Sequence, residues 1–494
     1  MAVDSQLIKI FTTMSEKYVT KSISTVRQPS QSNLLIAASG PKILSLGLES
    51  NAIVSEWAPV EAVTVEANGK EEDNENGERP AKKQKTSTAS PKAANVIKLA
   101  VSPGKRHVVA VTDDKFIHVF EQDHGKLTEL SQRAMPKRPC AIQITPDDAT
   151  ILVGDKFGDV YSLPLMPSEE GDVAAGAAPE ATPQPETQFK PSATNLTVHS
   201  KRNRDALAAQ MQQKNFTPRK EALKFEHKLL LGHVSMLTDM KYVRCEKDVQ
   251  KRGYIITADR DEHIRISRGP PQAHIIEGFC LGHTEFVSKI CQVGGSNLLV
   301  SGGGDPWLGI WEWWPEAKLR RRLTLPEKMK VPGHPLAVYG IWSGRVDLGS
   351  GEEDIVVVAC EKVKALLILD RTSVEQDGPG ICVKLSHNPI DVAFDDRSIL
   401  VSTDARQSSA DARDQRIQSL RVQKKTGELQ AEVDVSPRYI KALNEYSVQS
   451  ESIVGDKELE SLLYGVADLR KRRDQEGPEA EAEGGNGVTA DADD

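Results

Sequence analysis

Short apolar runs that recur in groups along the chain are the feature that most limits its possible folds. The runs are rich in Val and Ile and end at Gly, Asp, Asn or Pro; examples lie at 34–37, 108–111, 151–153, 298–300 and 355–358. Apolar segments of this length between turn-forming residues predict β-strands. Because helical periodicity is missing from most of the chain, we expect an all-β fold.

The groups of strands repeat at a regular interval. Gly-His pairs begin at Gly232, Gly282 and Gly333, and are therefore fifty and fifty-one residues apart. This interval slightly exceeds the ~40–45 residues of a WD repeat, which leaves room for longer loops. A chain of 494 residues is too long for one compact core, whereas each unit of a repeat fold buries its apolar face only against its neighbours. The sequence therefore predicts a WD-repeat β-propeller.

Composition divides the chain into a propeller, two insertions and a C-terminal extension. We expect the propeller to occupy residues 1–455, with polar, disordered insertions at about 61–94 and 166–222. Apolar residues at helical spacing, followed by Lys and Arg, predict a short amphipathic helix at 456–474. The acidic stretch 475–494 is expected to be a disordered tail.

Charge and cysteine content exclude several classes of function. The net charge of −8 gives no overall basic footprint for nucleic acid. None of the six cysteines forms a Cys-x-x-Cys pair, so we expect reduced core thiols and no metal site. The apolar runs are too short to span a bilayer, and the N-terminus lacks a signal-peptide pattern, which favours the cytosol or nucleus. The basic cluster 82–85 fits a nuclear import signal and a solvated charge run equally well.

Polar residues within the repeats match the buried network of a WD blade. In such a blade a His from a loop meets the Asp of a tight turn, with a Ser or Thr and a Trp beside them. Buried polar groups need these partners, since leaving them unsatisfied is costly. The matching residues are His283, Ser301, Asp305 and Trp311 in one repeat, and His233, Thr257 and Asp261 in the repeat before it, with Ser267 in place of Trp.

The same residues admit an enzymatic interpretation. Ser301, His283 and Asp305 superficially resemble a hydrolase triad, but no nucleophile elbow surrounds the serine. The glycines at 302–304 match no phosphate-binding motif, and the following segment reads as another strand. We therefore predict no catalytic, cofactor or metal site. A hydrolase would need His283 and Ser301 exposed in a cleft, whereas the WD network buries them.

The segment 259–265 carries more charge than a turn between strands requires. With Asp261 assigned to the network, the residues left over are Arg260, Glu262, His263 and Arg265. Alternating charges suit a solvated turn, and they also suit a partner site in which charge pairs set specificity and register.

Four segments carry a resemblance to a known family. The runs 155–162, 229–239, 257–267 and 279–288 resemble the non-catalytic WD-repeat subunit of the eukaryotic tRNA (guanine-N7-)-methyltransferase. The resemblance is strongest over about 140–315, apart from the long insertion, and extends more loosely to 463–472. Generic WD repeats do not share these strings. They argue against the alternative of a WD scaffold from another nuclear assembly, such as a ubiquitin ligase or chromatin complex.

The resemblance implies a seven-bladed propeller in the nucleus that holds no cofactor itself. It implies a heterodimer with a Rossmann-fold catalytic subunit that binds S-adenosylmethionine and methylates guanine in the variable loop of tRNA. The propeller would stabilise that subunit and meet tRNA mainly through the complex. Carried over by position, the partner contacts would be Arg265, Arg260, Glu262 and His263.

Overall fold

The computed structural model of the 494-residue chain describes most of the propeller and part of the C-terminal extension. The described residues are 20–28, 31–59, 94–167, 225–245, 247–330, 335–376, 378–406, 416–434, 438–445 and 456–471. The expected disordered segments lie outside these ranges, apart from residue 94 and residues 166–167 at their edges. The pair Gly333–His334 also lies outside the described residues.

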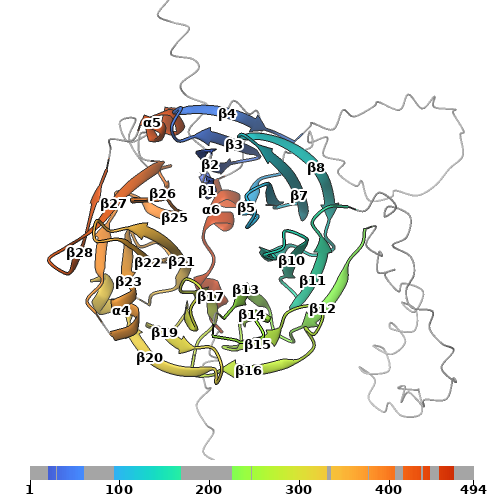
Figure 1. The fold of residues 1–494 in the computed structure, drawn as a ribbon. Helices are drawn as coiled ribbons and strands as arrows, with labels where there is room; N and C mark the ends of the chain where they lie inside the picture. Colours follow the sequence, from blue (N-terminus) through green and yellow to red (C-terminus); the bar gives the residue numbers. More distant parts are fainter. Residues whose placement is uncertain are drawn as a thin grey trace, which may run out of the picture.

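Seven four-stranded antiparallel sheets form a ring, which confirms the predicted seven-bladed propeller (Figure 1). Each sheet consists of four consecutive strands, so we number the blades in chain order. Blades 1 to 3 comprise β1 (Thr20–Gln28), β2 (Gln31–Ser39), β3 (Lys42–Gly47), β4 (Ala52–Trp57), β5 (Val96–Val101), β6 (His107–Thr112), β7 (Phe116–Asp123), β8 (Lys126–Ala134), β9 (Pro139–Ile144), β10 (Thr150–Asp155), β11 (Asp159–Pro164) and β12 (Lys228–Gly232).

Blades 4 to 7 continue in the same order around the ring (Figure 1). They comprise β13 (Leu237–Arg244), β14 (Gly253–Asp259), β15 (Ile264–Arg268), β16 (Ile276–Cys280), β17 (Val287–Gln292), β18 (Leu298–Gly303), β19 (Trp307–Glu312), β20 (Lys318–Thr324), β21 (Val338–Asp347), β22 (Glu352–Cys360), β23 (Ala365–Asp370), β24 (Ile381–Lys384), β25 (Asn388–Phe394), β26 (Ser398–Asp404), β27 (Ile417–Lys425) and β28 (Glu428–Val433).

The apolar runs of the sequence are the second strands of their blades. All five examples fall within β2, β6, β10, β18 and β22, and their residues are buried. A second strand has a neighbour on each side in its own sheet and an adjacent blade over each face. Since both faces are covered, the strand is apolar without alternation. Outer strands such as β4 and β20 instead alternate between more and less exposed residues, because one face meets water.

The first strand of each blade lines the central channel, and neighbouring first strands contact one another around the ring. The chain does not cross the joint between blade 7 and blade 1. There β1 packs against β25, and the backbone N–H of Ile23 donates to Asp391 Oδ2 over 2.9 Å. Helix α5 (Arg438–Glu445) covers this joint, because its Tyr439, Ile440 and Leu443 share a core cluster with β2 and β3 of blade 1.

Four further short helical segments follow strands or the last blade. Helices α3 (Leu325–Met329) and α4 (Arg371–Gln376) follow β20 and β23. Helix α6 (Asp456–Leu463) and the 3-10 turn η3 (Ala467–Leu469) form the C-terminal segment, residues 456–471. None of the helices in the described ranges has the length and apolar character needed to cross a membrane.

The predicted helix at 456–474 is too long, because α6 ends at Leu463. Gly465 adopts φ +147°, a conformation that side-chain-bearing residues rarely adopt. The Glu361 carboxylate then accepts the backbone N–H groups of Gly465, Val466 and Ala467. These contacts turn the chain away from the helix axis and fix it on the ring, so apolar periodicity past residue 463 does not reflect one helix.

Candidate functional site

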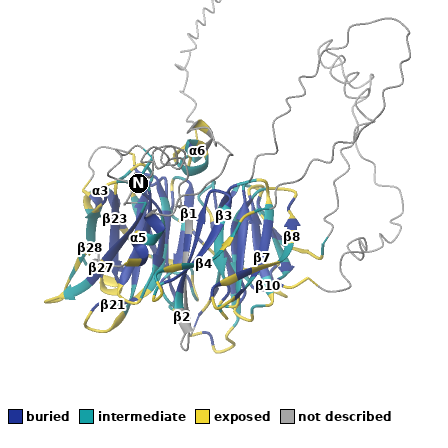
Figure 2. Cartoon of the chain, turned by 90° about the horizontal axis from the view of Figure 1, so that it is seen from above, coloured by how far each residue is buried: buried dark blue, intermediate teal, exposed yellow. Residues whose placement is uncertain are grey.

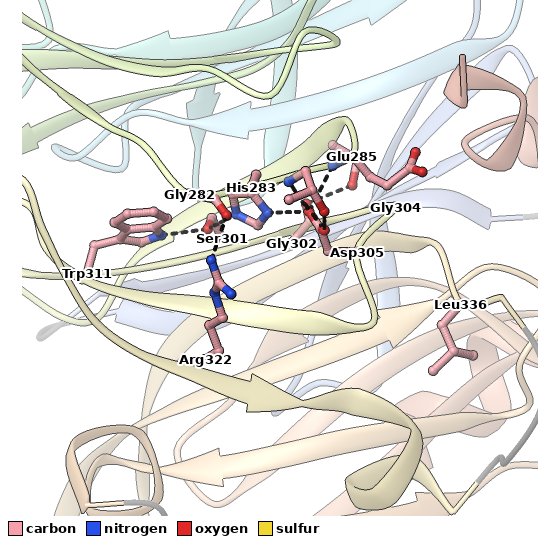
Figure 3. A network of polar contacts seen from close by, with 12 residues as sticks. Gly282, His283, Glu285, Ser301, Gly302, Gly304, Asp305, Trp311, Arg322 and Leu336 are labelled. Carbon is pink, nitrogen blue, oxygen red and sulfur yellow. Dashed lines mark hydrogen bonds and ion pairs between the residues drawn. The ribbon is translucent and has the colours of Figure 1, made fainter. Parts of the chain in front are cut away.

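A buried polar network in blade 5 brings together all four residues predicted for it (Figure 3). His283 Nδ1 lies 2.8 Å from Asp305 Oδ2, and its Nε2 lies 2.6 Å from Ser301 Oγ. Trp311 Nε1 donates to the same hydroxyl over 2.7 Å. Asp305 also accepts the backbone N–H and the hydroxyl of Thr284. The network therefore ties the loop before β17 to the turn between β18 and β19.

This geometry supports the structural interpretation and opposes the hydrolase. Ser301, Asp305 and Trp311 are fully buried, and His283 is 6% exposed. The Ser301 hydroxyl already accepts a hydrogen bond from Trp311 and contacts His283, so a substrate carbonyl has no route to it. The Trp307 ring stacks on the His283 ring, with 4.4 Å between the ring centroids, and Arg322 lies over Trp307. The triad-like set is part of the core of the blade.

In blade 4 the structure corrects one predicted residue of the network. His233 contacts Thr257 as expected, with Nε2 2.7 Å from Oγ1, but its Nδ1 faces Asp259 at 3.2 Å rather than Asp261. Asp259 is the last residue of β14, and its Oδ1 accepts the N–H groups of Asp261 and His263 across the turn. Asp261 lies on the outer side of that turn. The spacing between Ser301 and Asp305 therefore does not transfer to blade 4.

Arg265 occupies the place that the Trp side chain takes in blade 5. Cross-strand pairing sets Ser301 opposite Gly309 in blade 5 and Thr257 opposite Arg265 in blade 4. A Cβ atom on Gly309 would lie 2.5 Å from Trp311 Nε1, so the glycine makes room for the indole. Blade 4 has Ser267 instead of Trp, and the Arg265 guanidinium reaches over to donate to the Gly232 carbonyl at 3.1 Å. Replacement of Trp by Ser thus allows a charged residue at this position.

The arginine is half-buried, and its guanidinium is incompletely paired within the described part of the chain. Nε and Nη2 of Arg265 lack a hydrogen-bond partner there. Burial lowers the pKa of Arg265, and nearby Asp259 partly offsets that effect. A half-buried, partly unsatisfied guanidinium is costly for a residue whose only role is structural.

The other predicted partner residues divide into two groups. Arg260 and Glu262 already contact the C-terminal segment: Arg260 Nε donates to the Leu469 carbonyl at 2.8 Å, and Glu262 lies 3.1 Å from Lys471 Nζ. Lys471 also pairs with Asp261 at 3.2 Å. His263 is exposed and lies 3.6 Å from Asp259. The charged turn therefore serves first as a docking point for the C-terminus of the described chain.

The C-terminal segment crosses one face of the ring, as Figure 2 shows for α6. We call this the upper face; it carries the turns between the second and third strands of each blade. Tyr464 donates to Asp404 Oδ2 at 2.7 Å on blade 7, and Arg470 donates to the carbonyls of Gly304 and Leu336 on blades 5 and 6. Sequence reasoning missed this path, because its partners are separated from the segment by up to about two hundred residues.

Exposed apolar side chains gather beside Arg265 where blades 3 and 4 meet. We call Phe157, Val234, Arg265, Phe279 and Leu281 the blade 3–4 edge. Phe279 lies opposite Arg265 in the sheet and is 43% exposed; Leu281, two residues on, is 63% exposed. Gly158 packs so closely on the loop 233–235 that a Cβ would lie 2.5 Å from the His233 carbonyl, which brings exposed Phe157 next to exposed Val234.

This edge was only half predicted from the sequence. The charged residue Arg265 was singled out, but the apolar residues around it belong to three different loops and one strand. Exposed aromatic and aliphatic groups beside an arginine are the composition of a protein-binding surface rather than of a substrate pocket. Within the described ranges, no group of three or more His, Cys, Asp or Glu is arranged to hold a metal ion.

Fold and surface together define a WD-repeat propeller of the kind that binds other macromolecules. A family model described as the tRNA methyltransferase TRM82 WD40 domain matches residues 35–425. The chain belongs to this family.

Fungal relatives share most of the chain. It is 45% identical over 378 residues to the "tRNA (guanine-N(7)-)-methyltransferase non-catalytic subunit TRM82" of Phaeosphaeria nodorum, covering 73% of this chain and 76% of that protein. It is 39% identical to the protein with the corresponding name in Aspergillus oryzae, covering 90% of this chain and 95% of that protein. The relative in Meyerozyma guilliermondii is 30% identical, with coverage of 66% and 72%.

Proposed function

We propose that this protein is the non-catalytic subunit of a tRNA (guanine-N7-)-methyltransferase. It binds the S-adenosylmethionine-dependent catalytic subunit as a heterodimer and stabilises it for guanine methylation in the tRNA variable loop. It meets tRNA mainly through the complex. Family membership and the names of the relatives support the proposal, and the buried state of the Ser301 and His283 network removes the hydrolase alternative.

The blade 3–4 edge is the surface that we assign to the catalytic subunit. Burial of Phe279 and Leu281 would contribute the apolar part of the binding energy, about 1.5–3 kcal/mol for each side chain that becomes fully covered. Arg265, which lies opposite Phe279 in the sheet, would add a guanidinium to this surface, and a carboxylate of the partner could complete its hydrogen bonds. The single observation that carries this assignment is the exposure of these two apolar residues beside a half-buried arginine.

The charged turn 259–265, apart from Arg265, holds the C-terminal segment and is not the centre of the blade 3–4 edge. Arg260 and Glu262 hold the C-terminal segment, so their replacement would act on the partner through the position of that segment. His263 remains an exposed candidate contact. Of the four residues expected to contact the partner, we therefore assign the main direct contact to Arg265.

The test is co-expression of the tagged full-length protein with the catalytic methyltransferase subunit of the same organism. The double substitution Phe279→Asp and Leu281→Asp should weaken the complex by two orders of magnitude or more, about 1.5–3 kcal/mol per side chain, and lower guanine methylation to match. Val433→Asp is the matched control, because Val433 is 49% exposed on the outer strand β28 of blade 7. If all three proteins capture the catalytic subunit equally, the edge is not the interface.

Arg265→Glu tests the charged part of the same surface. Loss of a desolvated charge contact would cost about 2–5 kcal/mol of binding free energy. The substitution also removes the hydrogen bond to the Gly232 carbonyl, so its melting temperature must be compared with that of the parent. A fully folded Arg265→Glu protein that still forms an active complex would remove this residue from the interface.

The proposal includes localisation in the nucleus and membership of the methyltransferase complex rather than of another nuclear assembly. A fluorescent fusion should concentrate in the nucleus, and replacement of the lysines at 82–85 tests whether that cluster, which lies outside the described residues, acts as an import signal. Purification of the tagged protein from cells should yield the methyltransferase subunit. Recovery of a ubiquitin ligase or chromatin complex without it would favour the generic scaffold instead.

A further inference from the structure

Lysine side chains meet in the central channel of the ring. Lys98 on β5, Lys241 on β13 and Lys289 on β17 line a cavity of about 510 Å³, together with Asp239. The same cavity is bounded by residues 461–466 of the C-terminal segment. Blades 2, 4 and 5 therefore each contribute one ammonium group to one space, beneath a segment that crosses the upper face (Figure 1).

Among the described residues that line the cavity, lysines outnumber carboxylates. Asp239 accepts the Ile290 N–H at 3.2 Å, and Asp391, also in the lining, accepts the Ile23 N–H and the Trp342 indole N–H. None of the three lysine ammonium groups forms an ion pair or hydrogen bond with a residue in the described ranges. Among the described lining residues, three cations therefore face two carboxylates, which also accept hydrogen bonds from backbone and indole N–H groups.

Charge interactions around the cavity affect the lysines differently. Burial would lower the pKa of Lys241, but Asp239, Cys291 and Asp391 outweigh it and raise that pKa. Neighbouring Lys289 and burial together lower the pKa of Lys98 to about 8, although Asp239 and Cys140 act in the opposite direction. For Asp239, burial would raise the pKa, but the three lysines outweigh it and hold the pKa below its usual range. The three lysines are nevertheless only half-buried, so solvent reaches them. The channel thus concentrates positive charge where a small solute can enter.

We propose that the central channel is a binding site for a small phosphorylated anion, held by Lys98, Lys241 and Lys289 beneath the C-terminal segment. Ammonium groups are compact, strongly charged donors that bind phosphate oxygens. The cavity volume lies within the range of small-molecule sites, so the ligand is a low-molecular-weight phosphate compound and not a nucleic acid helix. Its charge would offset the repulsion between Lys98 and Lys289. The site is independent of the proposed interface on blades 3 and 4.

The experiment measures binding of inorganic tripolyphosphate to the full-length protein by titration calorimetry and by thermal unfolding. We expect saturable binding at one site and a higher melting temperature with the probe. The double substitution Lys98→Gln and Lys289→Gln should weaken binding by about a hundredfold, since two charge-assisted contacts are lost. ATP in a parallel titration distinguishes a nucleotide from a plain phosphate compound: tighter binding than tripolyphosphate indicates that the channel also accepts the base.

Two further variants make the result specific. Lys126→Gln is the matched control, because Lys126 is an exposed lysine on the outer strand β8. Asp239→Asn should tighten binding, since it removes a negative charge from the cavity lining. Without the probe, the lysine double variant should melt no lower than the parent, because it relieves repulsion. Absence of saturable binding, or equal weakening by Lys126→Gln, would overturn the proposal.

Discussion

Ser301 shows how much a single hydroxyl contributes inside a blade. It receives the Trp311 indole N–H and contacts His283 Nε2, and all three groups are buried. Ser301→Ala would leave two buried polar groups without a partner, each costing about 1–3 kcal/mol. We expect the free energy of unfolding in urea to fall by about 2–4 kcal/mol. Thr128→Ala, at an exposed position of β8, should change it far less; equal effects would mean that the network is not the cause.

The cysteines allow a second prediction at the scale of single residues. Burial raises the pKa of Cys280 and of Cys360 to about 12. The thiolate is the reactive form, and at pH 8 only a very small fraction of each of these thiols is ionised. We expect iodoacetamide to modify both residues slowly in the native protein and quickly in 6 M guanidinium, as mass spectrometry of tryptic peptides can show. Rapid native modification of Cys280 would contradict its burial.

At the scale of elements, Glu361 fixes the C-terminal segment to the ring. Its carboxylate accepts the N–H groups of Gly465, Val466 and Ala467. Glu361→Ala removes all of them, and hydrogen bonds to a charged group are worth about 1.5–3 kcal/mol each. Amide hydrogen exchange at 465–467 should therefore accelerate by at least about tenfold, while the second strands stay protected. Glu352→Ala, an exposed change in the same blade, should leave exchange unaltered.

The elements themselves were largely predictable, whereas their long-range contacts were not. Apolar runs identified the second strands because burial on both faces leaves a local signature, and the Gly-His spacing gave the repeat. Asp259 was missed in favour of Asp261 because two neighbouring blades use different spacings between Thr or Ser and Asp. Glu361 was missed because its three partners lie about a hundred residues later, and no local pattern reveals such a pair.

At the scale of the whole molecule, buried carboxylates link stability to pH. Burial would raise the pKa of Asp305, but hydrogen bonds from His283 and Thr284 outweigh it and hold the pKa below its usual range. Burial would also raise the pKa of Asp404, but hydrogen bonds from Arg406 and Tyr464 outweigh it and lower that pKa. A carboxyl with a lowered folded-state pKa stabilises the fold above its unfolded pKa of about 3.9, and that contribution is lost as pH falls through the folded pKa. Asp155, whose pKa burial raises, acts in the opposite direction.

We therefore expect the urea midpoint of unfolding to be constant near pH 5 and to fall steeply below about pH 4. Asp305→Asn should be less stable than the parent at pH 5, yet lose less of its remaining stability between pH 5 and pH 3. Intrinsic fluorescence at a series of pH values measures both quantities. Identical pH slopes for the two proteins would show that Asp305 does not contribute to acid unfolding.

The joint between blades 1 and 7 also governs the order in which the protein can fold. Every other joint is spanned by a connection along the chain, but Ile23 and Asp391 meet across 368 residues. Joining such distant residues costs more loop entropy than any contact between consecutive blades, and non-local pairing slows folding. Individual blades can form early from neighbouring residues, so ring closure is expected as a late step. Until β25 and α5 arrive to cover β1, the nascent chain is an open arc with two unprotected ends.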